Sequence, residues 1–140
     1  MFNVSTKTQY ALGLLQILAE RYGQGYVSLK EVARLKKYSS GYLQEIIVPL
    51  KKAKIIKSKE GLGGGYSLAK QPSAISLLQI LELIEGPLAP VKCINQDYQC
   101  PRQSHCTSRD IWQESTILLR DFFGSRTVAD LRGRKILITK

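Results

Sequence analysis

The stretch from residue 28 to residue 68 constrains the fold most, because two short helical patterns are followed there by two strand-like runs around a glycine-rich tip. In SLKE, the hydroxyl of Ser28 is expected to cap a helix while Glu31 reaches back to the backbone, which is a capping box. A second helix follows in SSGYLQEIIVPLKKA, whose apolar residues share one face. Two short helices joined by a tight polar turn are typical of a helix-turn-helix, and KIIKSKEGLGGGYSL predicts a β-hairpin directly after them. We therefore predict a winged helix-turn-helix.

Three further helices are predicted around this unit. From Thr6 to Tyr22, apolar residues recur at three- and four-residue spacing, which predicts an amphipathic helix with Tyr22 on its buried face. The segment LLQILELIE, capped by Ser76, is apolar on most sides and is expected to be buried. A last helix, opened by Thr107 and Asp110, is predicted to carry a wide apolar stripe. Because helix-turn-helix proteins usually read two half-sites as dimers, we interpret this last helix as a dimerisation helix.

The predicted fold is mainly α with a small β-hairpin wing, that is, a winged helix-turn-helix plus a long dimerisation helix. Residues 1–70 are expected to form the DNA-binding region. Residues 71–140 are expected to add the buried helix, a cysteine loop at residues 87–106 and the dimerisation helix at about 107–123, all within the same compact unit. A chain of 140 residues is long enough for one domain with a hydrophobic core.

The positive charge is concentrated in the first half of the chain. The net charge is +10, and residues 1–70 carry twelve Lys and Arg against four Asp and Glu, while residues 71–140 carry nine against seven. A basic patch attracts phosphate backbones, and also anionic membranes. The winged-helix pattern decides between them, because the basic residues do not lie on a long amphipathic surface helix. The tip GLGGGY lacks the Lys-Ser/Thr of a nucleotide-binding loop. We therefore expect a double-stranded DNA partner, with no membrane and no small-molecule substrate.

All three cysteines and the single histidine lie in CINQDYQCPRQSHC at residues 93–106. No apolar run approaches the roughly twenty residues of a membrane span, and MFNVSTKTQY lacks the pattern of a secretory signal, so we expect a cytoplasmic protein with reduced thiols. In that compartment, three thiols among polar residues are expected to be metal ligands or redox sensors and not a disulfide framework. The alternative is that they are buried or incidental, but buried cysteines normally have apolar neighbours.

The sequence resembles a known family. The run SGYLQEIIVPLKKAKIIKSKEGLGGGYSL, followed by a helix, a three-cysteine loop and a long helix, is similar to the bacterial winged-helix regulators of the IscR and NsrR type. The resemblance extends from VSTKTQYAL to TVADL and so covers nearly the whole chain. It implies a homodimeric transcription regulator, and not an enzyme. It also implies that operator affinity responds to an iron–sulfur cluster bound by the three cysteines and one further ligand.

The chemistry of the cysteines favours a cluster over zinc. Iron–sulfur clusters take soft thiolate ligands, whereas structural zinc prefers ligand pairs two to four residues apart, and six and five residues separate Cys93, Cys100 and Cys106. A 2Fe–2S cluster is slightly favoured over 4Fe–4S. The chain departs from the family in the longer first spacing and in Arg109, which stands where some members have a histidine ligand. The fourth ligand stays open between His105, Gln9 and no protein ligand.

Two other readings of the cysteines remain. A cluster-free winged-helix regulator would respond to thiol oxidation or to a protein partner. An enzyme with a cysteine nucleophile and His105 as base is weaker, because adjacent residues on a loop do not provide the required geometry.

The DNA contacts are predicted from helix ends and from the wing. Gln44 is placed to read the edge of adenine, while Lys57 and Lys59 flank the wing and can reach phosphates or a minor groove. Tyr42 is either a phosphate contact or a core aromatic. The full set of predicted DNA contacts is Ser5, Thr6, Lys7, Thr8, Lys30, Ser39, Ser40, Tyr42, Gln44, Lys51, Lys57, Lys59, Gly64 and Tyr66.

Overall fold

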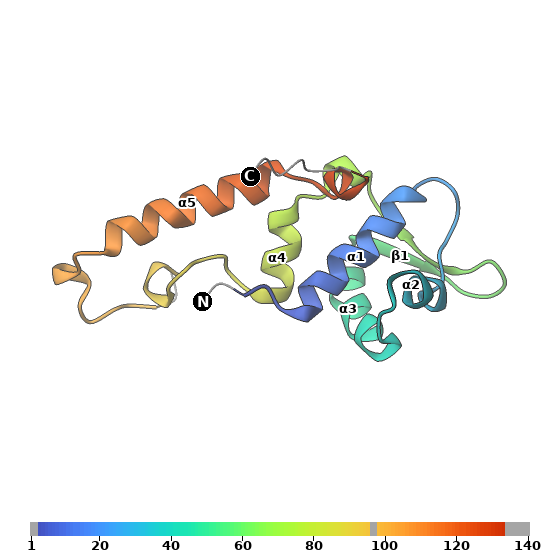
Figure 1. Ribbon diagram of the computed structural model, residues 1–140, viewed down its shortest axis with the longest axis horizontal. Helices are drawn as coiled ribbons and strands as arrows, with labels where there is room; N and C mark the ends of the chain where they lie inside the picture. Colours follow the sequence, from blue (N-terminus) through green and yellow to red (C-terminus); the bar gives the residue numbers. More distant parts are fainter. Residues whose placement is uncertain (1–2, 96–97, 134–140) are drawn as a thin grey trace, which may run out of the picture.

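The computed structural model describes residues 3–95 and 98–133 of the chain (Figure 1). The predicted order of elements and the predicted fold class are confirmed. The elements are α1 (Thr6–Glu20), α2 (Leu29–Lys36), α3 (Ser40–Lys52), β1 (Ile56–Lys59), β2 (Gly65–Leu68), α4 (Leu77–Glu85) and α5 (Arg109–Ser125), with short 3-10 helices η1 (Pro72–Ala74), η2 (Lys92–Ile94), η3 (Gln103–His105) and η4 (Val128–Leu131).

Most of the hydrophobic core lies in the winged-helix half of the molecule, and Ile75, Ile80 and Val128 complete it from the second half. Leu14 and Leu18 of α1 pack with Leu43 and Leu50 of α3, and all four side chains are at most 1 % exposed. Burying a side chain of this size contributes about 1.5–3 kcal/mol, so these contacts set the relative position of α1 and α3. The predicted burial of Tyr22 is wrong: α1 ends at Glu20, and Tyr22 is 39 % exposed in the turn that follows.

The helix-turn-helix forms as predicted, except for one half of its capping box. The hydroxyl of Ser28 accepts a hydrogen bond from the backbone N–H of Glu31 at 3.2 Å. The carboxylate of Glu31 does not turn back to the cap but forms an ion pair with Arg21 at 2.7 Å, since α1 ends close by. Lys37 ends α2 in the left-handed conformation, with φ at 57°, and turns the chain into α3.

The wing is a two-stranded antiparallel hairpin that is fastened to the segment before α2. Ile56 pairs with Leu68 and Lys59 with Gly65. Val27 and Tyr66 exchange two backbone hydrogen bonds of 2.9 and 2.8 Å. The outer edge of β2 therefore makes a short antiparallel contact with the segment before α2, and this contact requires a very close approach of the two backbones at Gly65.

The second half of the chain extends away from the winged helix, as Figure 1 shows for α5 and the loop that precedes it. Ser76 caps α4 as predicted, accepting from the backbone of Gln79 at 3.1 Å. Burial of α4 on most sides is wrong, because within this helix only Ile80 and Leu81 are buried and Leu83 is 36 % exposed.

The start of α5 also differs from its prediction. The helix begins at Arg109, and Ser108 takes the capping position that was expected of Thr107. After α5 the chain returns to the core through η4, where Val128 is fully buried. Its start is fixed by Thr127, whose backbone N–H donates to Asp130 at 2.8 Å. The two ends of the second half, α4 and η4, thus contact α1, while α5 and the cysteine loop lie further out.

Candidate DNA interface, cysteine loop and apolar face of α5

The N-terminus of α3 presents polar side chains to solvent. Ser39 and Ser40 are exposed, and the hydroxyl of Ser39 makes no capping hydrogen bond within the described residues. The backbone N–H groups at the start of a helix, together with its dipole, favour an anion such as a phosphate. Gln44 lies one turn further along α3 and is also exposed, so it has the accessibility that a base contact needs.

A cluster of three tyrosines supports this end of α3. Tyr10 of α1 stacks on Tyr38 with ring centroids 3.8 Å apart, and its ring lies 5.5 Å from that of Tyr42 at a tilt of 59°. Burial, and then the neighbouring Tyr10, raises the pKa of Tyr38 above its ordinary value. Tyr42 is 45 % exposed, so it packs against Tyr10 with part of its ring and offers the rest to solvent. Both interpretations of Tyr42 therefore have structural support.

The start of α1 lies beside α3, but its residues differ in accessibility. Thr6 is exposed and Ser5 and Lys7 are half-buried. The ammonium of Lys7 pairs with Glu45 of α3 at 3.2 Å, which leaves it at the surface between the two helices. Thr8 is fully buried, and its hydroxyl donates a hydrogen bond of 2.6 Å to the carboxylate of Glu85. The predicted DNA contact of Thr8 is not possible in this conformation, because the side chain has no accessible surface.

The wing carries its charge on one strand. Lys57 and Lys59 are exposed, and their ammonium groups lie 6.0 and 5.9 Å from the ring centre of Tyr26. Cation–π attraction to the Tyr26 ring restricts the positions of both lysines. No sequence pattern had pointed to Tyr26. The tip itself presents Leu62, which is fully exposed.

The remaining predicted DNA contacts divide into two kinds. Lys30 and Lys51 are exposed cations on the helix-turn-helix. Gly64 and Tyr66 are half-buried and shape the wing: a Cβ on Gly64 would lie 2.3 Å from the carbonyl oxygen of Lys59, and Tyr66 packs against the core.

The cysteine loop holds the three thiols at different depths. Cys93 lies in η2 and Cys100 in the following segment, both half-buried, while Cys106 is exposed after η3, next to the exposed His105. All three are free thiols. The donor set fits an iron–sulfur cluster in kind, but within residues 3–95 and 98–133 no three His, Cys, Asp or Glu side chains are gathered as metal ligands. Gln9, the other predicted ligand, is exposed on α1, and its amide donates to the carbonyl oxygen of Val4 at 3.3 Å.

Cys106 has a distinct local environment. Its Sγ lies 3.6 Å from the hydroxyl of Ser108, which also accepts from the indole N–H of Trp112 at 3.2 Å. The hydrogen bond from Ser108, aided by Arg109, lowers the pKa of the Cys106 thiol from its ordinary value. A lower pKa increases the thiolate fraction at neutral pH, and the thiolate is the form that binds metals and reacts with oxidants.

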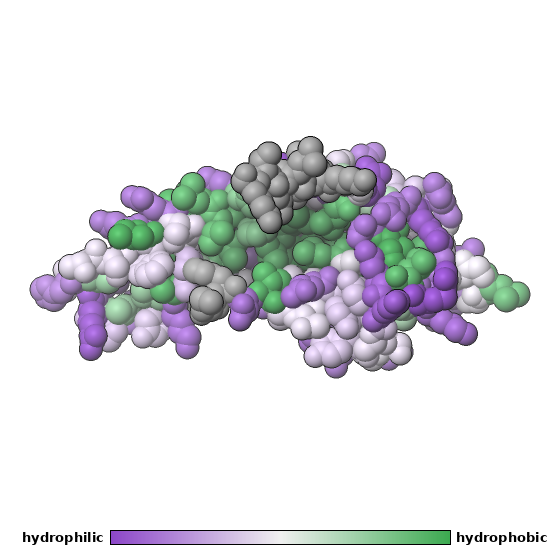
Figure 2. Space-filling view, viewed as in Figure 1, coloured by the Kyte–Doolittle hydropathy of each residue, from purple (hydrophilic) through white to green (hydrophobic). Residues whose placement is uncertain are grey.

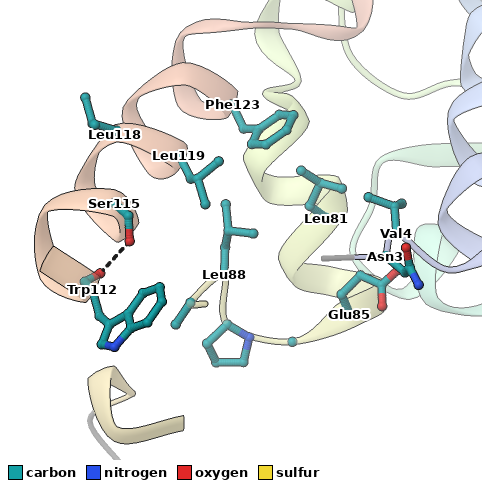
Figure 3. Close-up of a pocket in the computed structure, with 13 residues that line it drawn as sticks. Asn3, Val4, Leu81, Glu85, Leu88, Trp112, Ser115, Leu118, Leu119 and Phe123 are labelled. Atoms are coloured by element: carbon teal, nitrogen blue, oxygen red, sulfur yellow. Dashed lines mark hydrogen bonds between the residues drawn. The ribbon is translucent and has the colours of Figure 1, made fainter. Parts of the chain in front are cut away.

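The apolar stripe predicted for the last helix lies partly in solvent. Ile111, Leu118 and Phe122 of the stripe are between 52 and 70 % exposed, and Ile117, on another side of the helix, is 57 % exposed. Figure 2 shows apolar side chains along α5 and in the hollow between α5 and the winged helix. A cavity of about 700 Å³ opens there, lined from α5 by residues such as Trp112, Leu119 and Phe123, and from α4 and the following loop by residues such as Leu81 and Leu88 (Figure 3).

A helix-turn-helix followed by a basic wing, joined to a long helix with an exposed apolar face, defines a winged-helix regulator. A family model named Rrf2, described as an iron-dependent transcriptional regulator, matches residues 4–134. The chain belongs to the Rrf2 family, and the resemblance to regulators of the IscR type is confirmed.

Relatives are similar over most of their length. The chain is 32 % identical over 128 residues to the HTH-type transcriptional regulator CymR of Bacillus subtilis, covering 91 % of this chain and 88 % of CymR. It is also 32 % identical over 128 residues to the protein rrf2 of Nitratidesulfovibrio vulgaris, covering 91 % of this chain and 85 % of that protein.

Solved structures of the family have the same fold. The structure of CymR (YrzC), described as the global cysteine regulator of B. subtilis, aligns with a TM-score of 0.79 at 31 % identity, covering 97 % of this chain and 100 % of CymR. The structure of T. potens IscR aligns with a TM-score of 0.74 at 32 % identity, covering 93 % and 85 %. The chain is thus a transcriptional regulator like its relatives. In the described residues, no helix has the length and apolarity needed to cross a membrane.

Proposed function

We propose that the protein is a homodimeric regulator that binds a double-stranded DNA operator in the cytoplasm. The observation that carries this proposal is the exposed polar N-terminus of α3 on the same unit as the lysines of the wing. In such an arrangement α3 enters the major groove, where Gln44 contacts a base edge and Ser39 and Ser40 donate to phosphates. Lys30, Lys51, Lys57 and Lys59 supply the phosphate contacts that make binding depend on salt.

The dimer is proposed to form through α5. Ile111, Leu118 and Phe122 share one face of this helix, being seven and four residues apart, and all three are more than half exposed, which is unusual for a monomer. An isologous contact of two α5 helices would cover these side chains and bring two copies of α3 into one dimer. Sedimentation equilibrium of the purified protein tests this directly, and a monomer at micromolar concentration would exclude it.

The cysteine loop is proposed as the sensing element, with Cys93, Cys100 and Cys106 as ligands of an iron–sulfur cluster. The support is the soft donor set on one loop and the similarity to the T. potens IscR structure. Because the three side chains are not gathered within the described residues, binding requires the loop to rearrange. A cluster supplies sensitivity to oxidants and iron supply, and a 2Fe–2S cluster with a fourth ligand from His105 or Gln9 is the form we favour.

A second candidate is a cluster-free switch based on thiol oxidation. It is supported by the exposure of Cys106, by the lowered pKa of its thiol, and by the similarity to CymR. In this reaction the Cys106 thiolate attacks hydrogen peroxide, forms a sulfenic acid and releases hydroxide. One of the other thiols can then condense with it to a disulfide and release water.

The experiment that separates the two candidates is a visible absorption spectrum with iron and acid-labile sulfide assays on anaerobically purified protein. Stoichiometric iron and sulfide that are lost in Cys100→Ala would support the cluster. A colourless protein that fails reconstitution, but whose operator affinity changes with peroxide, would support the thiol switch.

DNA binding itself is tested by selection from a random duplex pool, followed by titration of the selected sequence. A protein that binds selected and random duplexes equally would contradict operator recognition. Arg102→Ala is a matched control for alanine variants of the wing lysines Lys57 and Lys59, because it also removes one positive charge. Arg102 belongs to the cysteine loop, which lies at the end of the molecule opposite the wing (Figure 1).

A further inference from the structure

The last residue of α4 is bonded to the first turn of α1. Glu85 Oε1 accepts the backbone N–H of Ser5 at 2.8 Å and the hydroxyl of Thr8 at 2.6 Å. Ser5 is the N-cap of α1, and its own hydroxyl accepts the backbone N–H of Thr8 at 3.2 Å. One carboxylate thus accepts hydrogen bonds from two groups in the first turn of α1. Thr6 and Lys7, in the same turn, are proposed to face DNA.

The preceding turn of α4 makes the other connections. Glu82 forms an ion pair with Arg120 of α5, and its Oε1 also accepts the backbone N–H of Leu88, at the root of the cysteine loop, at 3.2 Å. Between Glu85 and Leu88 the chain turns at Gly86, whose φ of 87° is a conformation that favours glycine. The C-terminal turn of α4 therefore joins α1, α5 and the cysteine loop within a few residues, as Figure 3 shows for Glu85, Leu81 and Leu88.

The position of Glu85 is unfavourable for α4 considered alone. The C-terminus of a helix carries partial negative charge, which repels carboxylates, and the last turn of α4 has no basic residue. The same carboxylate lies at the N-terminus of α1, where the partial charge is positive. Hydrogen bonding from Ser5 and from Thr8 lowers the pKa of Glu85 from its ordinary value, so it is charged at neutral pH. The Glu85 carboxylate is thus stabilised by the N-terminus of α1 and not by its own helix.

We propose that Glu85 is a positioning residue that couples the cysteine loop to the DNA-facing start of α1. The sensing half of this inference rests on the proposed function of the loop. A change in the loop reaches Gly86 and then Glu85, because only Gly86 separates Glu85 from the loop. Release of the carboxylate frees the N-cap of α1, and with it the placement of Thr6 and Lys7 against phosphates.

The probe is modification of the three cysteines with N-ethylmaleimide in the full-length protein, and the variants are Glu85→Ala and Glu85→Gln. Amide hydrogen exchange at Ser5 reports on the bond itself, and the ratio of operator affinities before and after modification reports on the coupling. In the unaltered protein, we expect modification to accelerate exchange at Ser5 on the order of tenfold, as for loss of a hydrogen bond to a charged group.

In Glu85→Ala, Ser5 should already exchange fast, and the affinity ratio should fall towards one. Glu85→Gln keeps an acceptor and should restore part of the ratio. The control is Glu20→Ala, which removes the same charge at the far end of α1 and should leave the ratio unchanged. A residue with only a structural role would weaken operator binding equally in both loop states.

The outcomes separate this inference from the proposed function. If modification accelerates Ser5 exchange but leaves operator affinity unchanged, the coupling stands and the sensing function of the loop fails. If modification of the unaltered protein leaves Ser5 exchange unchanged, the coupling is overturned, and this result requires no variant to fold. Where modification does change the operator affinity of the unaltered protein, an equal affinity ratio in Glu85→Ala would also overturn it.

Discussion

Replacing Gly65 by alanine is expected to detach β2 of the wing from the segment before α2. Gly65 has a φ of 142°, which disfavours any side chain, and a Cβ built there would lie 2.3 Å from the carbonyl oxygen of Val27 and 2.8 Å from the backbone nitrogen of Ser28. These are backbone atoms, so no side chain can rotate away to make room. The Val27–Tyr66 pair must separate, which breaks its hydrogen bonds of 2.9 and 2.8 Å.

The magnitude follows from two contributions. Loss of two backbone hydrogen bonds costs about 0.5–1.5 kcal/mol each, and the disfavoured φ costs about 1–3 kcal/mol, so the free energy of unfolding should fall by about 2–6 kcal/mol. A native domain has a total of about 5–15 kcal/mol, so the effect is large. Gly61→Ala is the matched control: Gly61 lies in the same hairpin with a φ of 87°, but an added Cβ there meets nothing within 4 Å. Gly61→Ala should therefore lower the free energy of unfolding only by the cost of the disfavoured φ.

The assay is urea unfolding at a fixed protein concentration, followed by far-ultraviolet circular dichroism and by fluorescence of Trp112, the single tryptophan, which lies on α5. If the wing only opens locally, both transitions should stay close to those of Gly61→Ala while operator affinity falls. If Gly65→Ala is no less stable than Gly61→Ala and binds the operator equally well, the close approach at Gly65 does not have the role assigned to it.

Three further predictions follow from the proposed interfaces. Gln44→Ala should reduce discrimination at one base pair by about 1–3 kcal/mol, whereas Lys57→Ala should weaken all sequences alike and flatten the salt dependence; identical effects of both on selected and random duplexes would contradict these roles. Leu118→Asp should shift sedimentation equilibrium to the monomer, because Leu118 is 70 % exposed on the proposed dimer face, and an unchanged dimer would place the interface elsewhere. Ser108→Ala should raise the pKa of Cys106 and slow its alkylation by iodoacetamide at pH 7, since the hydrogen bond from Ser108 is the main cause of the lowered value; an equal rate would exclude that cause.

Local sequence signals were sufficient for the elements of the fold. Ser28 and Ser76 cap their helices as the sequence predicts, because a cap depends on residues three positions apart. The hairpin follows for the same reason, from a glycine-rich tip between two short strand-like runs. Periodicity placed Tyr22 on the apolar face of α1, and α4 was expected to be buried because it is apolar on most sides, but neither pattern indicates where a helix ends or which of its apolar sides has a neighbour.

The contacts between distant residues could not be predicted from the sequence. Glu85 bonds to Ser5 and Thr8 across 80 and 77 residues, and no spacing rule connects such positions. The burial of Thr8, which removes it from the predicted DNA contacts, depends on that same contact. The placement of Lys57 and Lys59 beside Tyr26 likewise depends on how the wing folds against the segment before α2.

The distribution of packing explains why the second half of the chain is suited to regulation. In α5, which the structure describes completely, the only buried residue is Thr116, and neither η2 nor η3 of the cysteine loop has one. Regions with few buried contacts open at low free energy, and elements that move during switching are drawn from such regions. Dimer contacts can then stabilise the conformation of α5 as much as contacts within the monomer do. A bound cluster or a disulfide can do the same for the cysteine loop. The core of α1, α3 and the hairpin, which Ile75, Ile80 and Val128 complete, contains none of the described residues of the cysteine loop, so it stays folded while the loop changes. Ile75, Ile80 and Val128 anchor α4 and η4 in the same core as α1, and the polar contacts of Glu82 and Glu85 add links from α4 to α1, α5 and the loop, through which we expect the signal to pass.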